Sequence, residues 1–193
     1  IKTNPNPRAY LLLGFIYNET QKFDKAVELL NKVFEYKSME RLFPLAHNGL
    51  GFSYLKKGNF KTALYHFKKS LSYAEDPDIL YNIGVVYSQM SDYKNAVHYL
   101  KKAISIKNNY LPAYINLIEI YRRLGYKDKL AEIENEYRQK LDNSQSEGHF
   151  NTAVKLYIDG KLDEAFEEFK KSLEINPYSP AAHTNLGFIY YDK

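Results

Sequence analysis

The chain has 193 residues, which is enough for one ordinary domain or for a short array of repeats. Its 27 Lys and Arg against 23 Asp and Glu leave a net charge of +4, too weak to indicate nucleic acid or an anionic membrane as a partner. There are no cysteines, which excludes a disulfide framework, a thiolate metal site and a cysteine nucleophile. Aromatic residues reach 16%, with 19 Tyr and 11 Phe, and this high share needs a structural explanation.

Segments that would direct the chain to or through a membrane are not visible. The most apolar stretch, 11–17, is far shorter than the ~18 apolar residues that a membrane-spanning helix requires. No signal peptide is seen. The chain begins at Ile1 rather than at Met, so we expect any targeting segment to lie outside the given sequence. The sequence therefore leaves the cellular location open.

A short sequence motif recurs along the chain. It reads Leu-Gly-Phe-Ile-Tyr at 13–17, Leu-Gly-Phe-Ser-Tyr at 50–54 and Leu-Gly-Phe-Ile-Tyr at 186–190, with a relative at 83–87. The small residue of this motif and its equivalents follow one another in steps of 37, 33, 34, 35 and 34, at Gly14, Gly51, Gly84, Ile118, Ala153 and Gly187. Columns three and twelve residues further on keep the same steps. Three columns with one period indicate an array of structural repeats.

Each repeat has the pattern of two helices. In the third repeat the apolar residues of 80–87 recur at i, i+3, i+4 and i+7, which is one face of a first helix. Ala96, Leu100 and Ala103 then recur at i, i+4 and i+7, one face of a second helix. Small residues let two antiparallel helices approach closely, and flat aromatic side chains fill the seams between repeats. This pattern accounts for the high Tyr and Phe content.

Glycine and proline punctuate the same pattern. Gly58, Gly125 and Gly160 share one register between first and second helix, where a left-handed helix terminus favours glycine. All seven prolines lie between repeats or at the first turn of a first helix, where proline is tolerated. No alternating strand pattern of useful length is present. The fold class expected is therefore all-α.

This pattern resembles the tetratricopeptide repeat (TPR), a 34-residue helix–turn–helix unit, and the third repeat shows it most fully. The resemblance covers about residues 7–193 and implies a single α-solenoid, a right-handed superhelix of antiparallel helix pairs. Five full repeats are expected at about 7–43, 44–76, 77–110, 111–145 and 146–179, with the first helix of a sixth at 180–193. Such a motif is specific for fold and nearly silent on function.

The fourth repeat departs most from the family pattern. Ile118 replaces the small residue, Leu130 replaces the alanine, and the polar tail at 141–148 is expected to be a flexible joint. The segment 3–7 echoes 175–180, and the chain stops just after a first helix. We therefore expect this chain to be a part of a longer array.

The resemblance implies a concave face, lined by first helices, that binds an extended peptide or a partner's helix. A column of asparagines lies on it, two residues before the small residue, at Asn82, Asn116, Asn151 and Asn185. An amide can donate to a peptide C=O and accept from its N–H, so this column is similar to the asparagine ladder of superhelical TPR proteins. Leu12 and Gly49 interrupt the column in the first two repeats, although Asn48 is adjacent. The alternative is that these asparagines bond neighbouring helices.

The other side chains expected on the concave face are mostly apolar. They are Leu11, Phe15, Phe52, Tyr81, Phe150, Tyr157 and Phe188, with polar Glu119, Arg122 and Arg123. The aromatic side chains suit the side chains of a bound peptide, and the alternative for them is packing between repeats. The arginines suit an acidic group or a C-terminal carboxylate, and the alternative for them is solvated charge.

Nothing in the sequence indicates catalysis, a metal or a cofactor. The histidines lack the spacing of a metal site, and there is no Gly-rich phosphate loop or nucleophile elbow. Lysine pairs at 68–69, 101–102 and 170–171 form a stripe on the second helices, which we interpret as a solvated surface rather than one for nucleic acid or lipid.

The function expected is a non-catalytic scaffold that binds a protein or peptide partner in the concave groove. One alternative is a TPR region that presents substrates to a larger enzyme, such as a glycosyltransferase. Another is an assembly factor of a secretion or pilus system. Self-association through uncapped ends of the array is a further possibility.

Overall fold

The computed structural model describes residues 6–192, with the backbone alone for residues 191 and 192, and no strand occurs among these residues. The helices are α1 (Pro7–Glu19), α2 (Phe23–Lys32), α3 (Phe43–Lys56), α4 (Phe60–Leu71), α5 (Pro77–Gln89), α6 (Tyr93–Ile106), α7 (Leu111–Leu124), α8 (Lys127–Ile158), α9 (Leu162–Ile175) and α10 (Pro180–Asp192). Two 3-10 helices, η1 (Val33–Glu35) and η2 (Lys37–Leu42), join α2 to α3 and hold the residues that lengthen the first repeat. The all-α class is confirmed.

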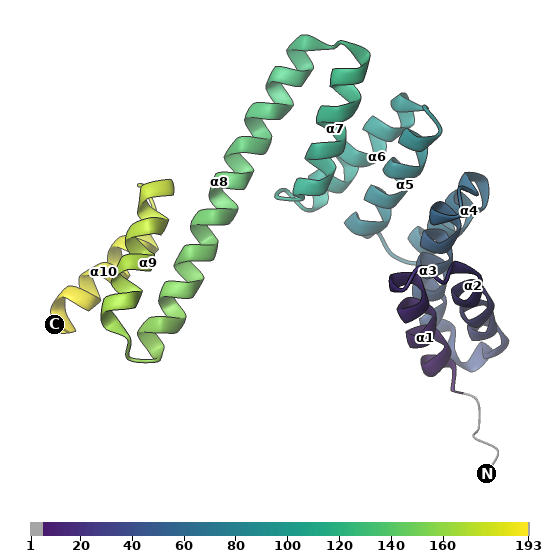
Figure 1. The fold of residues 1–193 in the computed structure, drawn as a ribbon, viewed down its shortest axis with the longest axis horizontal. Coiled ribbons are helices and arrows are strands. Elements are labelled where there is room, and N and C mark those ends of the chain that lie inside the picture. The colour runs from purple at the N-terminus through teal and green to yellow at the C-terminus, as the bar shows by residue number, and fades with distance from the viewer. Residues whose placement is uncertain (1–5, 193) are drawn as a thin grey trace. The chain divides into compact units, whose positions relative to one another are not determined.

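The chain divides into two units, residues 1–124 and 125–193, each with its own internal contacts. In the N-terminal unit every helix from α1 to α6 packs against the next helix along the chain (Figure 1). The first helices of successive repeats also touch, α1 with α3, α3 with α5 and α5 with α7. These contacts are those of a solenoid, and they place the first helices side by side.

The recurring small residue packs tightly against a side chain of the second helix in the first three repeats. A Cβ atom on Gly14 would lie 2.6 Å from two atoms of Leu30, and one on Gly51 would lie 2.6 Å from the Phe67 ring. The space beside these glycines is therefore already filled by a buried side chain of the second helix. The steric reason given for the small residue is confirmed at these positions.

The turn between first and second helix is left-handed at one position in every repeat of the described chain. Gly58, Gly125 and Gly160 have φ of +74°, +70° and +75°, as their register predicts. Gln21 and Ser91 occupy the equivalent position in the first and third repeats, with φ of 58° and 60°. These two residues adopt the same left-handed conformation at a steric cost that glycine does not bear.

Prolines and side-chain caps begin the first helices. A proline stands in the first turn of α1, α3 and α5, where no N–H is needed for the helix. The Asn6 side chain accepts a hydrogen bond from the N–H of Arg8 at 2.9 Å, and Asp76 accepts one from Asp78 at 2.8 Å. The expected placement of the prolines is confirmed for these helices.

The C-terminal unit contains a correction to the sequence interpretation. The segment 141–148, expected to be a flexible joint, lies inside α8, which runs unbroken from Lys127 to Ile158. Its polar side chains are mostly exposed and the segment contains no proline, so a continuous helix can carry them all. Polarity here marks a solvated helix, and the second helix of the fourth repeat continues directly into the first helix of the fifth.

Reciprocal hydrogen bonds join α8 to α9. The Ser146 hydroxyl donates to the Ser172 carbonyl oxygen at 3.0 Å, and the Ser172 hydroxyl donates to the Ser146 carbonyl oxygen at 2.9 Å. Both serines are buried. Further along the same pair of helices Ala153 packs with Ala165 and Phe169, so the C-terminal half of α8 pairs with α9 as a first helix does. In the described residues no helix is long and apolar enough to cross a membrane.

Candidate peptide groove on the first helices

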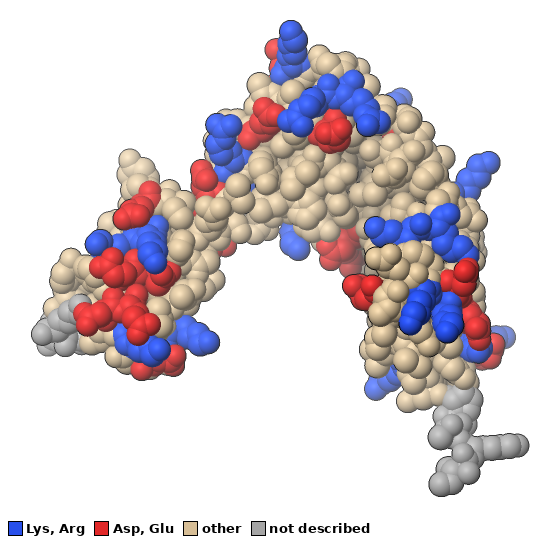
Figure 2. Space-filling model, viewed as in Figure 1, with Lys and Arg blue, Asp and Glu red and all other residues tan. Residues whose placement is uncertain are grey.

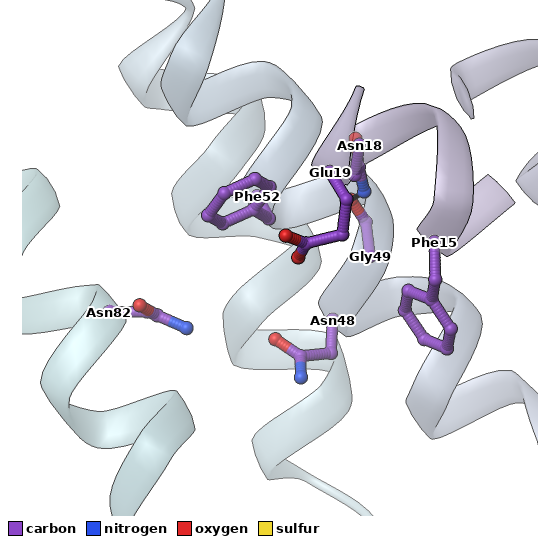
Figure 3. Close-up of a pocket in the computed structure, with 7 residues that line it drawn as sticks. All are labelled: Phe15, Asn18, Glu19, Asn48, Gly49, Phe52 and Asn82. Atoms are coloured by element: carbon purple, nitrogen blue, oxygen red, sulfur yellow. Dashed lines mark hydrogen bonds between the residues drawn. The ribbon is translucent and has the colours of Figure 1, made fainter. Parts of the chain in front are cut away.

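A cavity of about 170 Å³ lies on the first helices of the N-terminal unit (Figure 3). We call it the α1–α3–α5 groove. Its lining residues are Phe15, Asn18 and Glu19 of α1, Asn48, Gly49 and Phe52 of α3, and Asn82 of α5. All three helices are first helices, so the groove lies on the face that the sequence predicts to be the binding face.

The floor of the groove is fixed by a buried hydrogen-bond network between α1 and α3. The Asn18 amide donates to the Gly49 carbonyl oxygen at 2.9 Å, and its carbonyl accepts from the Ser53 hydroxyl at 2.6 Å. The Ser53 hydroxyl also lies 2.9 Å from the Gly49 carbonyl oxygen. Asn18 is buried, so its amide holds two first helices together and is not available to a ligand.

Gly49 interrupts the asparagine column for a steric reason. A Cβ at this position would lie 2.9 Å from the Phe15 ring and 2.9 Å from Leu30. A side chain there would displace Phe15 from the wall of the groove. The amide of this repeat is supplied by Asn48, one residue earlier.

Two amides of the groove have no partner within the described chain. Asn48 and Asn82 are partly buried, and no hydrogen bond joins either side chain to another described residue. Figure 3 shows both amides directed toward the same space between α3 and α5, with the Glu19 carboxylate beside them. Each amide can donate hydrogen bonds from its NH2 group and accept them at its carbonyl oxygen. A ligand that offers both N–H and C=O groups fits this arrangement.

The remaining asparagines of the predicted column are placed differently. Asn116 on α7 donates to the Tyr81 hydroxyl at 3.2 Å and to the Pro112 carbonyl oxygen at 3.0 Å. In the C-terminal unit Asn151 is exposed on α8, and Asn185 donates to the Ala181 carbonyl oxygen within α10 at 2.8 Å. Asn116 therefore shows the contact with a neighbouring helix that was the alternative interpretation.

Of the aromatic candidates, Phe15 and Phe52 line the groove, whereas Tyr81 packs edge-on against Tyr110 with ring centres 5.3 Å apart. Phe150 and Tyr157 pack in the apolar cluster between α8 and α9 of the C-terminal unit. Phe188 is exposed on α10. Leu11, also expected on the concave face, is instead buried in the core between α1 and α2.

The two arginines lie at the C-terminal end of α7. The Arg122 guanidinium is 3.8 Å from the Glu119 carboxylate, and both side chains are exposed. Arg123 donates to the Tyr93 hydroxyl of α6 at 3.1 Å, and this bond lowers the pKa of Tyr93. The binding role of both arginines stays a prediction.

The lysine pairs of the second helices lie among acidic and aromatic neighbours. Lys102 pairs with Glu75, Lys171 lies 2.6 Å from Glu168, and Lys68 donates to the Tyr87 hydroxyl at 3.1 Å. Figure 2 shows basic and acidic side chains interspersed over the visible face. Among the described residues no group of three or more His, Asp or Glu is arranged to hold a metal ion.

The fold defines the class of protein, an α-solenoid of helix pairs, and the first helices α1, α3 and α5 line the groove. Family models described as tetratricopeptide repeat match residues 7–38 and 43–109, and one described as TPR repeat matches residues 154–193. Together they cover well over half of the sequence, and the chain belongs to the TPR family. The longest unmatched stretch, 110–153, holds α7 and most of α8 and includes the fourth repeat, where the repeat pattern is weakest.

Solved TPR structures resemble the chain in fold. YrrB, described as a TPR protein with an unusual peptide-binding site, has 20% identity and a TM-score of 0.60, over 93% of this chain and 91% of YrrB. PilW, a type IV pilus biogenesis factor, has 19% identity and a TM-score of 0.63, over 94% and 83%. A thermophilic TPR protein of Thermus thermophilus has 20% identity and a TM-score of 0.57, over 96% and 100%. No curated protein matches the chain by sequence.

Proposed function

We propose that this chain is a non-catalytic scaffold that binds an extended peptide segment of a partner protein in the α1–α3–α5 groove. The observation that carries the proposal is the pair of amides, Asn48 and Asn82, that face the cavity without a partner in the described chain. A partly buried amide without a partner loses hydrogen bonds to water when a ligand covers it, unless the ligand replaces them. A peptide main chain offers both the donors and the acceptors that would do so.

The spacing of the first helices suits an extended chain. Packed helix axes are about 10 Å apart, and an extended peptide advances about 3.3 Å per residue. One first helix would therefore meet roughly every third residue of the peptide. Asn48 and Asn82 lie on successive first helices, so they would bond the main chain at two points and leave the intervening side chains to the Phe15 and Phe52 rings.

The Glu19 carboxylate gives the groove a preference for a basic side chain. It is exposed in the groove, and no ion pair joins it to another described residue. A lysine or arginine of the peptide would gain a charge-assisted hydrogen bond there, with an aromatic ring close by. The Phe52 ring already has the Lys56 ammonium 5.3 Å from its centre, so a cation beside this ring has a precedent in the chain itself.

The comparisons support the proposal at the level of fold. YrrB is described as having a peptide-binding site, and its likeness of 20% identity makes a peptide ligand a reasonable expectation here. The two alternatives from the sequence, a region that presents substrates to a larger enzyme and an assembly factor, have no described residue that favours them. They stay predictions.

Selection from a displayed library of random 12-residue peptides, against the full chain, tests the proposal. We expect N48A/N82A to bind the selected peptides at least tenfold more weakly, while the helical circular dichroism signal is retained. A matched control is N135A/N143A, which removes two exposed amides from α8. A preference for Lys or Arg should disappear with E19Q. Equal binding by wild type and N48A/N82A would remove the groove from consideration.

A further inference from the structure

The two units of the chain carry net charges of opposite sign. Residues 1–124 hold 18 Lys and Arg against 10 Asp and Glu, a net charge of +8. Residues 125–193 hold 9 Lys and Arg against 13 Asp and Glu, a net charge of −4. The modest overall charge of +4 therefore conceals a basic N-terminal unit and an acidic C-terminal unit. Charge divided in this way favours contacts between unlike parts of different molecules.

Positive charge in the N-terminal unit is concentrated on two second helices. The helices α4 and α6 each contain three lysines and no acidic residue. Contacts through α5 join them, because the Lys68 ammonium lies 5.6 Å from the centre of the Tyr87 ring, and the rings of Tyr87 and Tyr99 stack with centres 5.5 Å apart. Lys102 of α6 also pairs with Glu75, which follows α4. We call the exposed lysines of the two helices the α4–α6 basic face; they are Lys61, Lys68, Lys69, Lys94, Lys101 and Lys102.

The α4–α6 basic face is only partly neutralised within the described chain. Of its six lysines, Lys102 alone forms an ion pair with a described residue. Tyr65 stands among these lysines with 55% of its surface exposed, and the Lys69 ammonium lies 6.0 Å from the centre of its ring. Lys61, Tyr65 and Lys69 are spaced i, i+4 and i+8, so they lie on one side of α4. An aromatic ring flanked by two ammonium groups suits an acidic surface with an apolar recess.

The helix α9 presents the opposite charge in the same register. Counted from the left-handed glycine before each helix, Asp163 stands where α4 has Lys61, and Glu167 stands where α4 has Tyr65. The helix contains five acidic residues and two lysines, a net charge of −3. We call its exposed carboxylates at the start of the helix the acidic face of α9; they belong to Asp163, Glu164 and Glu167.

An open cavity of about 590 Å³ lies at the acidic face of α9. The carboxylates of this face line it, and Leu156 of α8 contributes an apolar side chain. Cavities of roughly 300–1,000 Å³ hold small organic ligands, so this one has room for an aromatic ring. Two of the carboxylates make only exposed pairs within the same segment, since Glu164 lies 3.8 Å from Lys161 and Glu167 lies 3.5 Å from Lys170. Such surface pairs contribute little, so the ammonium groups of a partner can replace them.

We propose that copies of this chain associate through the α4–α6 basic face of one copy and the acidic face of α9 of the next. The occupant is a second copy because the chain itself supplies the complementary charge in the matching register. In this contact Lys61 and Lys69 pair with carboxylates of α9, and the Tyr65 ring enters the cavity beside Leu156. The two faces are different surfaces and every copy carries both, so the contact is heterologous. The product is an assembly that grows with protein concentration or closes into a ring.

This contact is separate from the peptide groove and from the ends of the array. The groove is lined by the first helices α1, α3 and α5, whereas both charged faces lie on second helices. We therefore expect N48A/N82A to associate as the wild type does, so the two proposals succeed or fail independently. Association through uncapped ends, which the sequence left open, would not depend on the lysines of α4.

Sedimentation velocity of the full chain over a range of concentrations, at low salt and at ~0.5 M salt, tests the proposal. We expect the average mass of the wild type to rise with concentration at low salt, and high salt to weaken the association at least tenfold. K61E/K69E and E164K/E167K should each be monomeric, because each places like charges in the contact. An equal mixture of the two variants should associate again, since the first keeps the acidic face of α9 and the second keeps the lysines of α4.

The matched control is K127E/K129E, which changes the net charge as much as K61E/K69E does but lies on α8 outside both faces. It should associate as the wild type does. All three variants replace exposed side chains, so their circular dichroism should match that of the wild type. A wild type that stays monomeric at every concentration overturns the proposal, as does association that survives high salt or K61E/K69E, or a mixture of variants that stays monomeric.

Co-sedimentation with vesicles that contain an anionic lipid covers the other occupant of a basic face. A monomeric wild type that binds these vesicles, together with a K61E/K69E variant that does not, would overturn self-association in favour of a membrane surface. We expect instead that the vesicles do not compete with the contact between copies.

Discussion

His47 of α3 and His66 of α4 face each other with their Nδ1 atoms 2.9 Å apart. One ring donates and the other accepts, so at least one of the two must be neutral at this nitrogen. In the fifth repeat the equivalent positions hold His149 and Glu168, with Nδ1 and Oε2 2.7 Å apart. The same contact between first and second helix is thus made by two histidines in the second repeat and by a histidine and a carboxylate in the fifth. Protonation of a histidine is opposed by the first pair and favoured by the second.

The His47–His66 pair should make the N-terminal unit less stable in mild acid. Burial, the His66 ring and Lys69 lower the pKa of His47 to about 4, and burial also lowers the pKa of His66. Because both pKa values are lower in the folded state, the unfolded chain binds more protons between about pH 4 and pH 6.5. The stability is therefore present above pH 6.5 and is lost as the pH falls. Urea unfolding at pH 7.5 and pH 5.0 measures this loss.

The variant H66E tests the cause, because it copies the pair of the fifth repeat. A glutamate beside His47 favours the charged imidazole and would raise the pKa of His47 above its unfolded value. The contribution of the pair should then be present in acid and be lost as the pH rises through the new pKa. If H66E and the wild type keep the same pH dependence, the histidine pair is not the group responsible.

A glycine inside a helix should tolerate alanine only where the structure leaves room. A Cβ on Gly84 would lie 2.8 Å from Leu100 Cγ, so we expect G84A to cost about 1–3 kcal/mol through overpacking. Gly148 lies in the interior of α8 with nothing within 4 Å of an added Cβ. There alanine is the better helix former, and G148A should stabilise its unit by about 1 kcal/mol. Thermal unfolding of both variants gives the comparison, and effects of the same sign would contradict it.

The left-handed turns offer a stabilising substitution. Gln21 and Ser91 have positive φ, a conformation that costs a residue with a Cβ about 1–2 kcal/mol. Glycine avoids this strain, but it loses more chain entropy on folding, which offsets part of the gain. Q21G and S91G should therefore each raise the free energy of unfolding by roughly 0.5–1 kcal/mol. Gly58 has the same role in the second repeat, and G58A should lower stability by a similar amount. The midpoints of urea unfolding curves decide the sign of each change.

The periodic columns predict the fold well because they record contacts that recur in each repeat. The positive φ of Gly58, the prolines of the first helices and the tight contact at Gly51 all follow from the register. Gln21 and Ser91 escape the same reasoning because their side chains give no sign of a left-handed backbone. Only their register, which is that of Gly58, places them at the left-handed turn.

The groove is less predictable than the fold because its residues depend on contacts between neighbouring helices. The spacing places Asn82 on the binding face, but it does not reveal that Asn116 is engaged by Tyr81. Asn48 takes part in the groove although it is one residue out of the column, since a side chain at Gly49 has no room. Glu19 carried no sequence signal and was found from the cavity alone.

The continuity of α8 is the clearest difference between the sequence interpretation and the structure, and a single proline distinguishes them. If 141–148 were a flexible joint, a proline at Ser144 would be harmless. Ser144 instead lies in the interior of a helix from Lys127 to Ile158, where proline removes a backbone hydrogen bond and clashes with the preceding turn. S144P should therefore lower the stability of the C-terminal unit by about 3 kcal/mol and reduce the helical circular dichroism signal.

The matched control for this variant is S144A, which keeps the helix and removes the hydroxyl of an exposed side chain. Alanine has the highest helix propensity, so S144A should be neutral or slightly stabilising. Hydrogen exchange of the amides in 141–148 gives an independent measurement, since groups bonded within a helix exchange more slowly than those of an open joint. Slow exchange in the wild type and fast exchange in S144P would show that 141–148 is part of one continuous helix. Fast exchange in both proteins would instead support the flexible joint that the sequence predicts at 141–148.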